Sequence, residues 1–298
     1  MDRLEIAHKK PDISCGKGLR LKSMKFDPAD WLNRARDEAL AMRASTVAFF
    51  KRKDVRAALN WIKEPLLSVA VVFFATTAIA QPFYVPSGSM QPTLAIGDAV
   101  LAAKFPYGYS RYSIPFMNGP TPHGRFLEHM PAVGDVVVFR LPRDTKITYV
   151  KRVIGLPGDH IQMREGRLWI NGRELPLREA GIGEDEMGDG RFIDAAKYIE
   201  TLPGGREHPI FKWQWDGPLD NTQEFVVPKG CVFMMGDNRD DSSDSRVSPE
   251  TGGVGYVPVG NLVGRAFVVI GSVDFKNADA IWDWVTEFRF SRVLNGVR

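Results

Sequence analysis

The sequence predicts a mainly β domain that follows a single membrane-spanning helix. Its 298 residues include 28 Gly and 20 Pro, a composition that favours a turn-rich β structure over a helix bundle. From Val85 onward, short β-like runs alternate with Gly/Pro turns. One uncharged apolar stretch, residues 65–80, precedes this region. These observations divide the chain into a basic N-terminal region (1–63), a transmembrane anchor (64–84) and a β domain (85–298).

Charge is distributed unevenly between these parts. Residues 1–63 carry a net charge of +7, whereas the remainder carries −4. A basic segment of this kind suits nucleic acid, but it also suits the cytoplasmic face of a membrane, because Lys and Arg stay on the side from which a helix inserts. The apolar stretch that follows favours the membrane, so we expect lipid rather than nucleic acid as a partner. The weakly amphipathic segment 31–50 fits a cytoplasmic juxtamembrane helix.

The apolar stretch itself reads PLLSVAVVFFATTAIA and contains no charge. Its 16 residues would give a helix of about 24 Å, and continuing through Val85 gives 21 residues, enough to cross a hydrocarbon core of about 30 Å. Trp61 and Tyr84 lie near the two ends, where amphipathic rings favour the interface. The Lys and Arg residues before the stretch predict that its carboxyl side lies outside the cytoplasm. A cleavable leader ending at 78–80 and a buried helix are the alternatives.

Seven short runs after Val85 have the composition of strands: 99–105, 135–141, 147–154, 167–170, 224–227, 231–235 and 264–270. Asn171-Gly172, after the fourth run, is a strong hairpin signal. Residues 172–222 are polar and irregular, which predicts a small β/loop insertion in the β core. Residues 279–290 predict a short amphipathic helix.

Neither a disulfide nor a bound metal is expected. Cys15 and Cys231 are the only cysteines, and they lie on opposite sides of the predicted anchor. Cys231 is expected to be a small buried apolar residue. The chain has no HExxH or CxxC, and the acidic run 236–246 lacks the EF-hand spacing. We therefore predict no metal and no other cofactor.

Ser89 is the first candidate for chemistry, in the segment PSGSMQPTL (86–94). Most serines among Gly and Pro are ordinary turn residues. The segment lacks the GxSxG pattern of α/β-hydrolases, and none of the five histidines has a visible triad context. If Ser89 is a nucleophile, a group other than histidine must take its proton.

Lys151 is the candidate for that group. In a strand with period two it shares a face with Ile147, Tyr149 and Val153, so it lies within an apolar row. Burial there would lower its pKa from about 10.4, because desolvation penalises the ammonium. The alternative is a lysine on an edge strand whose charged end reaches solvent.

The run GDNRDDSSDSR (236–246) is the third candidate segment. Two arginines among its carboxylates favour an ion-paired, hydrogen-bonded loop over a calcium site. Such a loop would rigidify a site and supply a hydroxyl to a neutral lysine.

Four segments together resemble those of bacterial type I signal peptidases, or leader peptidases, a family of Ser/Lys proteases. They are PSGSMQPTL, GDVVVF (134–139), YVKRVIGLPGD (149–159) and GDNRDDSSDSR, and they occur in the family's order after an apolar anchor. The four cover about an eighth of the chain. The resemblance implies a mostly antiparallel β catalytic core on the outer, periplasmic side of the bacterial inner membrane, held there by a single-pass helix.

The resemblance also implies roles for individual residues. Ser89 matches the nucleophile and Lys151 the general base. The Ser87 side chain and the Ser89 amide match the oxyanion hole. Residues in supporting roles are Ser242, which positions the lysine amine, the Asp244/Arg246 ion pair, and Met90, which packs near the lysine. The candidates for shallow apolar substrate subsites are Tyr84, Val85, Leu94, Tyr149 and Val150.

The activity that the resemblance implies is a membrane-bound serine endopeptidase. It would remove N-terminal signal peptides from exported precursor proteins through an acyl-enzyme. A self-cleaving repressor-type Ser/Lys protease, soluble and DNA-binding, is the alternative enzyme, and a membrane-tethered peptide-binding β domain is the non-enzymatic one. The uncharged stretch 65–80 argues against the repressor type.

The aromatic residues at 282, 284, 288 and 290 suit either the membrane interface or a core.

Overall fold

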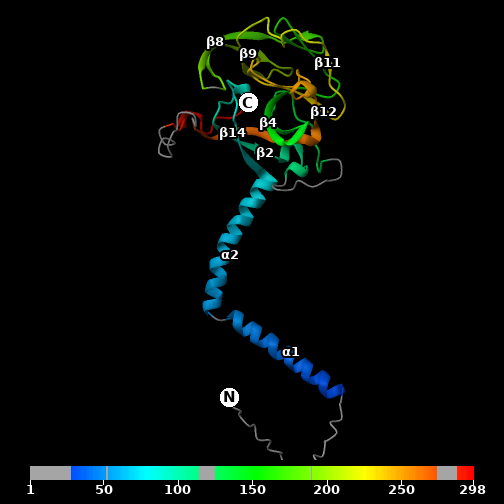
Figure 1. Ribbon diagram of the computed structural model, residues 1–298, viewed down its shortest axis with the longest axis vertical. Helices are drawn as coiled ribbons and strands as arrows, with labels where there is room; N and C mark the ends of the chain where they lie inside the picture. The colour runs from blue at the N-terminus through cyan, green and yellow to red at the C-terminus, as the bar shows by residue number, and fades with distance from the viewer. Residues whose placement is uncertain (1–27, 52, 114–124, 189, 274–286) are drawn as a thin grey trace, which may run out of the picture. The chain divides into compact units, whose positions relative to one another are not determined.

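The protein is described by a computed structural model over residues 28–51, 53–113, 125–188, 190–273 and 287–298 (Figure 1). The chain forms two compact units, Met1–Leu66 and Leu67–Arg298. Two helices come first along the chain, α1 (Pro28–Lys51) and α2 (Lys53–Phe74), and a π-helical turn η1 (Ala75–Ile79) continues the second. Among the residues that the structure describes, no helix has both the length and the apolar character needed to cross a membrane.

The last five residues of the predicted anchor 64–84 form a strand instead of a helix. Strand β1 (Ala80–Tyr84) pairs antiparallel with β2 (Asp98–Ala103), with Ala80 opposite Ala103. Because β1 lies at the edge of its sheet, Pro82 is tolerated there although it has no N–H to donate. This pairing satisfies the backbone groups on one side of Ala80–Tyr84, and the helical segment ends at Ile79.

An antiparallel sheet of seven strands forms the centre of the second unit, in the order β1-β2-β14-β3-β4-β12-β13. The remaining strands are β3 (Val136–Leu141), β4 (Asp144–Gly155), β12 (Cys231–Met235), β13 (Val257–Pro258) and β14 (Leu262–Ser272). All pairings between the named strands of the described chain are antiparallel. The prediction of a mainly antiparallel β fold is confirmed.

A second sheet has the order β11-β5-β6-β7. Its strands are β5 (His160–Arg164), β6 (Arg167–Ile170), β7 (Arg173–Glu174) and β11 (Phe225–Val226). Asn171 and Gly172 join β6 to β7 with φ angles of 51° and 74°. The two-residue hairpin predicted at this position is confirmed.

The inserted segment is more regular than its sequence suggests. It contains β8 (Leu177–Glu186), β9 (Phe192–Thr201) and β10 (Glu207–Lys212), which form a three-stranded antiparallel sheet in the order β10-β9-β8. Exposed side chains dominate β8 and most side chains of β9 are half-buried, so the alternation of polar and apolar residues that signals a strand is weak there. In Figure 1, β8 and β9 lie at the top of the view, and β2 and β14 lie below them.

Short 3₁₀ turns make up the other regular structure: η2 (Gly88–Met90), η3 (Phe105–Tyr107), η4 (Arg111–Ser113), η5 (Pro249–Thr251), η6 (Val259–Asn261) and η7 (Phe290–Arg292). The helix predicted at 279–290 falls largely on residues 279–286, which lie outside the described part of the chain. Trp282, Trp284 and Cys15 also lie outside it.

Cys231 was predicted to be buried but is only half-buried, because it is the first residue of β12, at the margin of the sheet.

Candidate active site

Ser89 lies in the 3₁₀ turn η2, which follows β1 along the chain. Its neighbours Gly88 and Met90 are buried, whereas Ser89 is half-exposed. Ser89 is therefore the residue of this turn that solvent or a substrate can reach. The Gln91 N–H donates to the Gly88 carbonyl at 2.9 Å, and the Leu94 N–H donates to the Met90 carbonyl at 2.9 Å. Met90 belongs to the same buried apolar cluster as Val85 and Leu94, and this packing fixes the turn.

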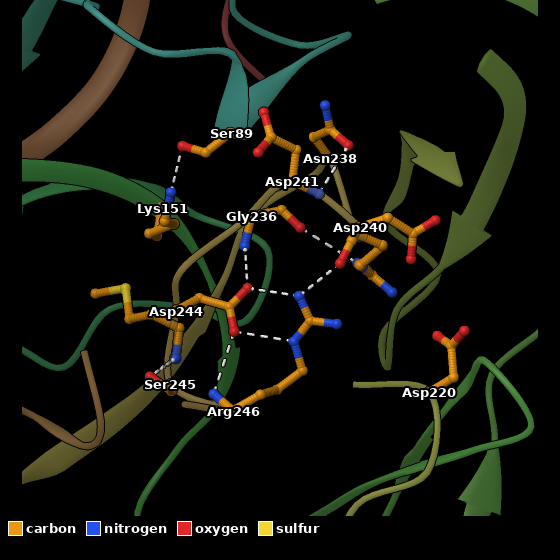
Figure 2. Close-up of polar contacts among 12 residues, drawn as sticks. Ser89, Lys151, Asp220, Gly236, Asn238, Asp240, Asp241, Asp244, Ser245 and Arg246 are labelled. Carbon is orange, nitrogen blue, oxygen red and sulfur yellow. Dashed lines mark hydrogen bonds and ion pairs between the residues drawn. The ribbon is translucent and has the colours of Figure 1, made fainter. Parts of the chain in front are cut away.

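Lys151 comes from the middle of β4, opposite Val137 of β3. Only 3% of the residue is exposed. Its Nζ forms a hydrogen bond with Oγ of Ser89, and Figure 2 shows the two side chains directed at each other. The Tyr149 ring centroid is 5.7 Å from the same nitrogen. The structure therefore brings together the two residues predicted as nucleophile and base.

The environment of Lys151 lowers its pKa to about 8. Burial is the main cause, because desolvation penalises the charged amine. The carboxylates of Asp244, Asp237 and Asp241 act in the opposite direction and keep the pKa from falling further. The lowered pKa increases the share of uncharged amine next to the serine hydroxyl at mildly alkaline pH.

Asp244 and Arg246 form a buried ion pair behind this amine. The Arg246 Nε donates to Asp244 Oδ1 at 2.9 Å and its Nη2 donates to Oδ2 at 2.8 Å. The Gly236 N–H also donates to Asp244 Oδ2, at 3.1 Å (Figure 2). These contacts hold the loop 236–246 in one conformation, as an ion-paired and hydrogen-bonded loop.

Ser242 does not make the hydrogen bond predicted for it. Its Oγ is buried and has no hydrogen-bond partner in the structure, whereas the Lys151 Nζ is directed at Ser89. Ser242 instead lies against Gly236, where a Cβ would approach its Oγ to 2.2 Å. The missing side chain at Gly236 is what leaves room for the hydroxyl.

Ser87 is exposed and close to the nucleophile. Its Oγ is 3.4 Å from Oγ of Ser89, and both residues line a pocket of about 440 Å³. The side chain that the resemblance assigns to the oxyanion hole therefore lies beside the serine hydroxyl.

The pocket brings together four of the five predicted subsite residues: Tyr84, Val85, Tyr149 and Val150. Leu94 was predicted as the fifth, and this is wrong. It is completely buried within the apolar cluster of Met90 and does not line the pocket. The hydrogen bond from its N–H to Met90 closes a turn that directs the side chain into the core.

Seven further lining residues were not predicted as part of the site: Phe83, Pro86, Val100, Val138, Thr148, Asp241 and Ser243. Strand register explains two of them. Val100 lies opposite Phe83 in the β1/β2 pair, and Val138 lies opposite Val150 in the β3/β4 pair. Alternation within one strand was visible in the sequence, but the partner across the ladder was not.

A buried ion pair next to the dyad was also missed. Arg152 Nη2 donates to Asp237 Oδ2 at 2.6 Å and its Nε donates to Oδ1 at 2.8 Å. The Thr93 hydroxyl donates to Asp237 Oδ2 at 2.5 Å. Burial alone would raise the pKa of Asp237, but Arg152 holds it below its usual range. This pair links β4, the nucleophile segment and the loop 236–246.

The described residues contain no group of three or more His, Cys, Asp or Glu side chains that would hold a metal ion. The pocket itself presents a serine hydroxyl, a buried amine of lowered pKa and a second serine hydroxyl beside them.

Known proteins resemble this chain over most of its length. Residues 58–271 match the family model described as signal peptidase, peptidase S26. A signal peptidase I from Rickettsia canadensis is 40% identical over 250 residues, covering 77% of this chain and 89% of the relative. The signal peptidase I of Rickettsia typhi is 36% identical over 252 residues, covering 77% and 90%.

A third relative, the signal peptidase I of Rickettsia akari, is 39% identical over 205 residues, which is 66% of this chain and 74% of the relative. The family model spans the nucleophile turn, β4 and the loop 236–246, where the predicted motifs lie. This chain belongs to the signal peptidase family, peptidase S26.

Proposed function

We propose that Ser89 and Lys151 form the catalytic dyad with which this serine endopeptidase removes signal peptides from exported precursors. The contact between the Lys151 amine and the Ser89 hydroxyl, inside the apolar pocket, is the observation that supports this assignment. Among the residues that the structure describes, no histidine lines the pocket, and Lys151 is the amine base within reach of Ser89.

In the first step, the uncharged amine of Lys151 takes the proton of Ser89 as Oγ attacks the scissile carbonyl. The Ser89 amide and the Ser87 hydroxyl stabilise the oxyanion that forms, and loss of one such donor lowers kcat by about 10²–10³-fold. The resulting lysine ammonium returns its proton to the leaving amine. Water then hydrolyses the acyl-enzyme with Lys151 again as base.

The substrate lies extended in the pocket, beside β1 and β4. Tyr84 and Val85 come from the first strand and its extension, and Tyr149 and Val150 come from the second. Since β1 is an edge strand, its free side can pair with an extended peptide. The shallow apolar lining suits small residues next to the cleaved bond.

We also propose that the segment 65–79 associates with the bacterial inner membrane and keeps the β domain on its outer side. Leu67, Val69 and Val72 are each more than 60% exposed, although the segment carries no charge. Water is a poor solvent for such a surface, whereas lipid is a good one. Recovery of the full chain in the membrane fraction after alkaline carbonate washing tests this, and recovery in the soluble fraction would favour the repressor-type alternative.

The dyad is tested by cleavage of a precursor with a signal peptide by the detergent-solubilised full chain. Ser89→Ala and Lys151→Ala should each reduce kcat by at least about 10³-fold, as removal of a nucleophile or its base does in other serine proteases. Lys146→Ala is the matched control, since Lys146 is exposed on the same strand and should retain wild-type activity. Wild-type rates in both dyad variants would exclude this mechanism.

A further inference from the structure

The end of the inserted strand β8 contacts the turn that carries Ser89. The Gln91 Nε2 donates to the Glu186 carbonyl at 3.1 Å, and the Glu186 N–H donates to Gln91 Oε1 at 3.0 Å. Gln91 is only 5% exposed. Its side-chain amide thus pairs with the backbone of β8 as a second strand would, through one donor and one acceptor.

Gly88 permits this close approach. A Cβ at Gly88 would lie 2.9 Å from the Glu186 carbonyl oxygen and 2.8 Å from the Gln91 Nε2. Both distances are too short for a real side chain. The backbone of the turn and the end of β8 are therefore in direct contact.

Asn238 provides a second link between the insertion and the turn. Its Nδ2 donates to Asp185 Oδ2 at 2.7 Å, and its backbone N–H donates to the Ser89 carbonyl at 3.2 Å. Asp185 is completely buried and also accepts a hydrogen bond from Trp213 Nε1, at 2.9 Å. The inserted sheet is therefore joined to both sides of Ser89, through Gln91 and through Asn238.

We propose that the inserted sheet β8–β10 sets the orientation of the nucleophile, with Gln91 as a positioning residue for Ser89. The inference rests on the proposed role of Ser89. The turn η2 has only three residues, and the donor to the oxyanion is its own backbone amide. A rotation of this turn would move both the hydroxyl and the amide away from the substrate carbonyl. The two links to β8 oppose such a rotation.

This arrangement separates catalysis from substrate binding. Gln91, Asp185 and Glu186 do not line the pocket, so their loss should leave KM nearly unchanged. Gln91 carries no charge and does not contribute to the pKa shift of Lys151. The pH at which kcat/KM reaches half of its maximum should therefore also be unchanged.

The test compares Gln91→Met, which keeps the length of the side chain but loses both hydrogen bonds, with the wild-type chain on a precursor substrate. A misplacement of about 1 Å costs about 10²-fold in rate, so we expect kcat to fall by about 10- to 100-fold. Asp185→Ala removes the second link from the insertion side and should lower kcat in the same direction. This second variant keeps the test valid if one of the two fails to fold.

Arg206→Gln is the matched control. Arg206, between β9 and β10, pairs with Asp135 Oδ1 at 3.0 Å, a contact between the insertion and the core that is independent of the Ser89 turn. We expect wild-type kcat from this variant. Wild-type kcat in folded Gln91→Met and Asp185→Ala would overturn the inference, as would an equal loss in Arg206→Gln. Failure of the proposed function is distinct, because Ser89→Ala would then cleave normally.

Discussion

At the scale of single residues, the site depends on one lysine held in an unfavourable environment. A lysine pKa lowered from 10.5 to about 8 corresponds to about 3 kcal/mol of folding free energy, at 1.36 kcal/mol per unit. The unfolded chain binds more protons than the folded one between these two values, so stability rises with pH in that window. Below pH 8 the amine is protonated in both the folded and the unfolded state, and the full loss of folding free energy applies. In return, the same burial provides the uncharged amine that the proposed general-base role of Lys151 requires.

The same pKa predicts the pH dependence of the reaction. Because Lys151 must be uncharged to accept the serine proton, kcat/KM should rise about tenfold per pH unit below pH 8 and level off above it. Stopped assays of precursor cleavage from pH 5.5 to 9.5, on enzyme shown to remain folded, measure the profile. A constant rate across this range would contradict a general-base role for Lys151.

At the scale of elements, turn chemistry fixes where strands reverse. Gly172 has a φ of +74° and no atom within 4 Å of its missing Cβ. A side chain there would meet no neighbour, so any effect of a substitution comes from the backbone conformation itself. A substitution at Gly172 in the β6/β7 hairpin therefore measures the cost of the backbone conformation without a change in packing.

Gly172→Ala should therefore lower the free energy of unfolding by about 1 kcal/mol, because a left-handed backbone is unfavourable for any residue with a Cβ. Gly260→Ala is the control: its Cβ would also be in open space, but its φ is not in the left-handed region. Urea unfolding of both variants gives the comparison. Equal effects at the two positions would show that the φ angle is not the cause.

At the scale of the whole β domain, buried ion pairs join parts that are distant in sequence. Arg152 and Asp237 are both almost fully buried and are 85 residues apart. Arg239 pairs similarly with Glu200 of β9, at 2.5 Å. A buried charge that loses its partner is far more costly than an exposed one. Such pairs hold the loop 236–246 against both β4 and the inserted sheet.

Asp237→Ala should accordingly destabilise the domain by about 3–5 kcal/mol, since Arg152 would remain buried without a counter-charge. Glu174→Ala breaks the exposed Arg167–Glu174 pair, whose side chains are 43% and 40% exposed, and should cost at most about 1 kcal/mol. Chemical unfolding at pH 7 distinguishes the two. A small effect of Asp237→Ala would mean that water or a shifted side chain replaces the lost carboxylate.

The sequence by itself determined the family and much of the local structure. The ordered motifs around Ser89 and Lys151 predicted the family, which the comparisons confirm. The Asn171-Gly172 hairpin and seven of the fourteen strands in the described part of the chain were also predicted. These features depend on residue type, on period and on turn conformation, which are properties of short segments.

Tertiary structure alone decided which distant groups meet. It ended the helical segment at Ile79, buried Leu94 in the core, left Ser242 without the predicted bond, and joined Gln91 to a strand 95 residues away. Each outcome depends on strand register and on packing between loops. Those contacts form only when the whole sheet is assembled, because no short segment specifies the partner that a side chain will face across the ladder.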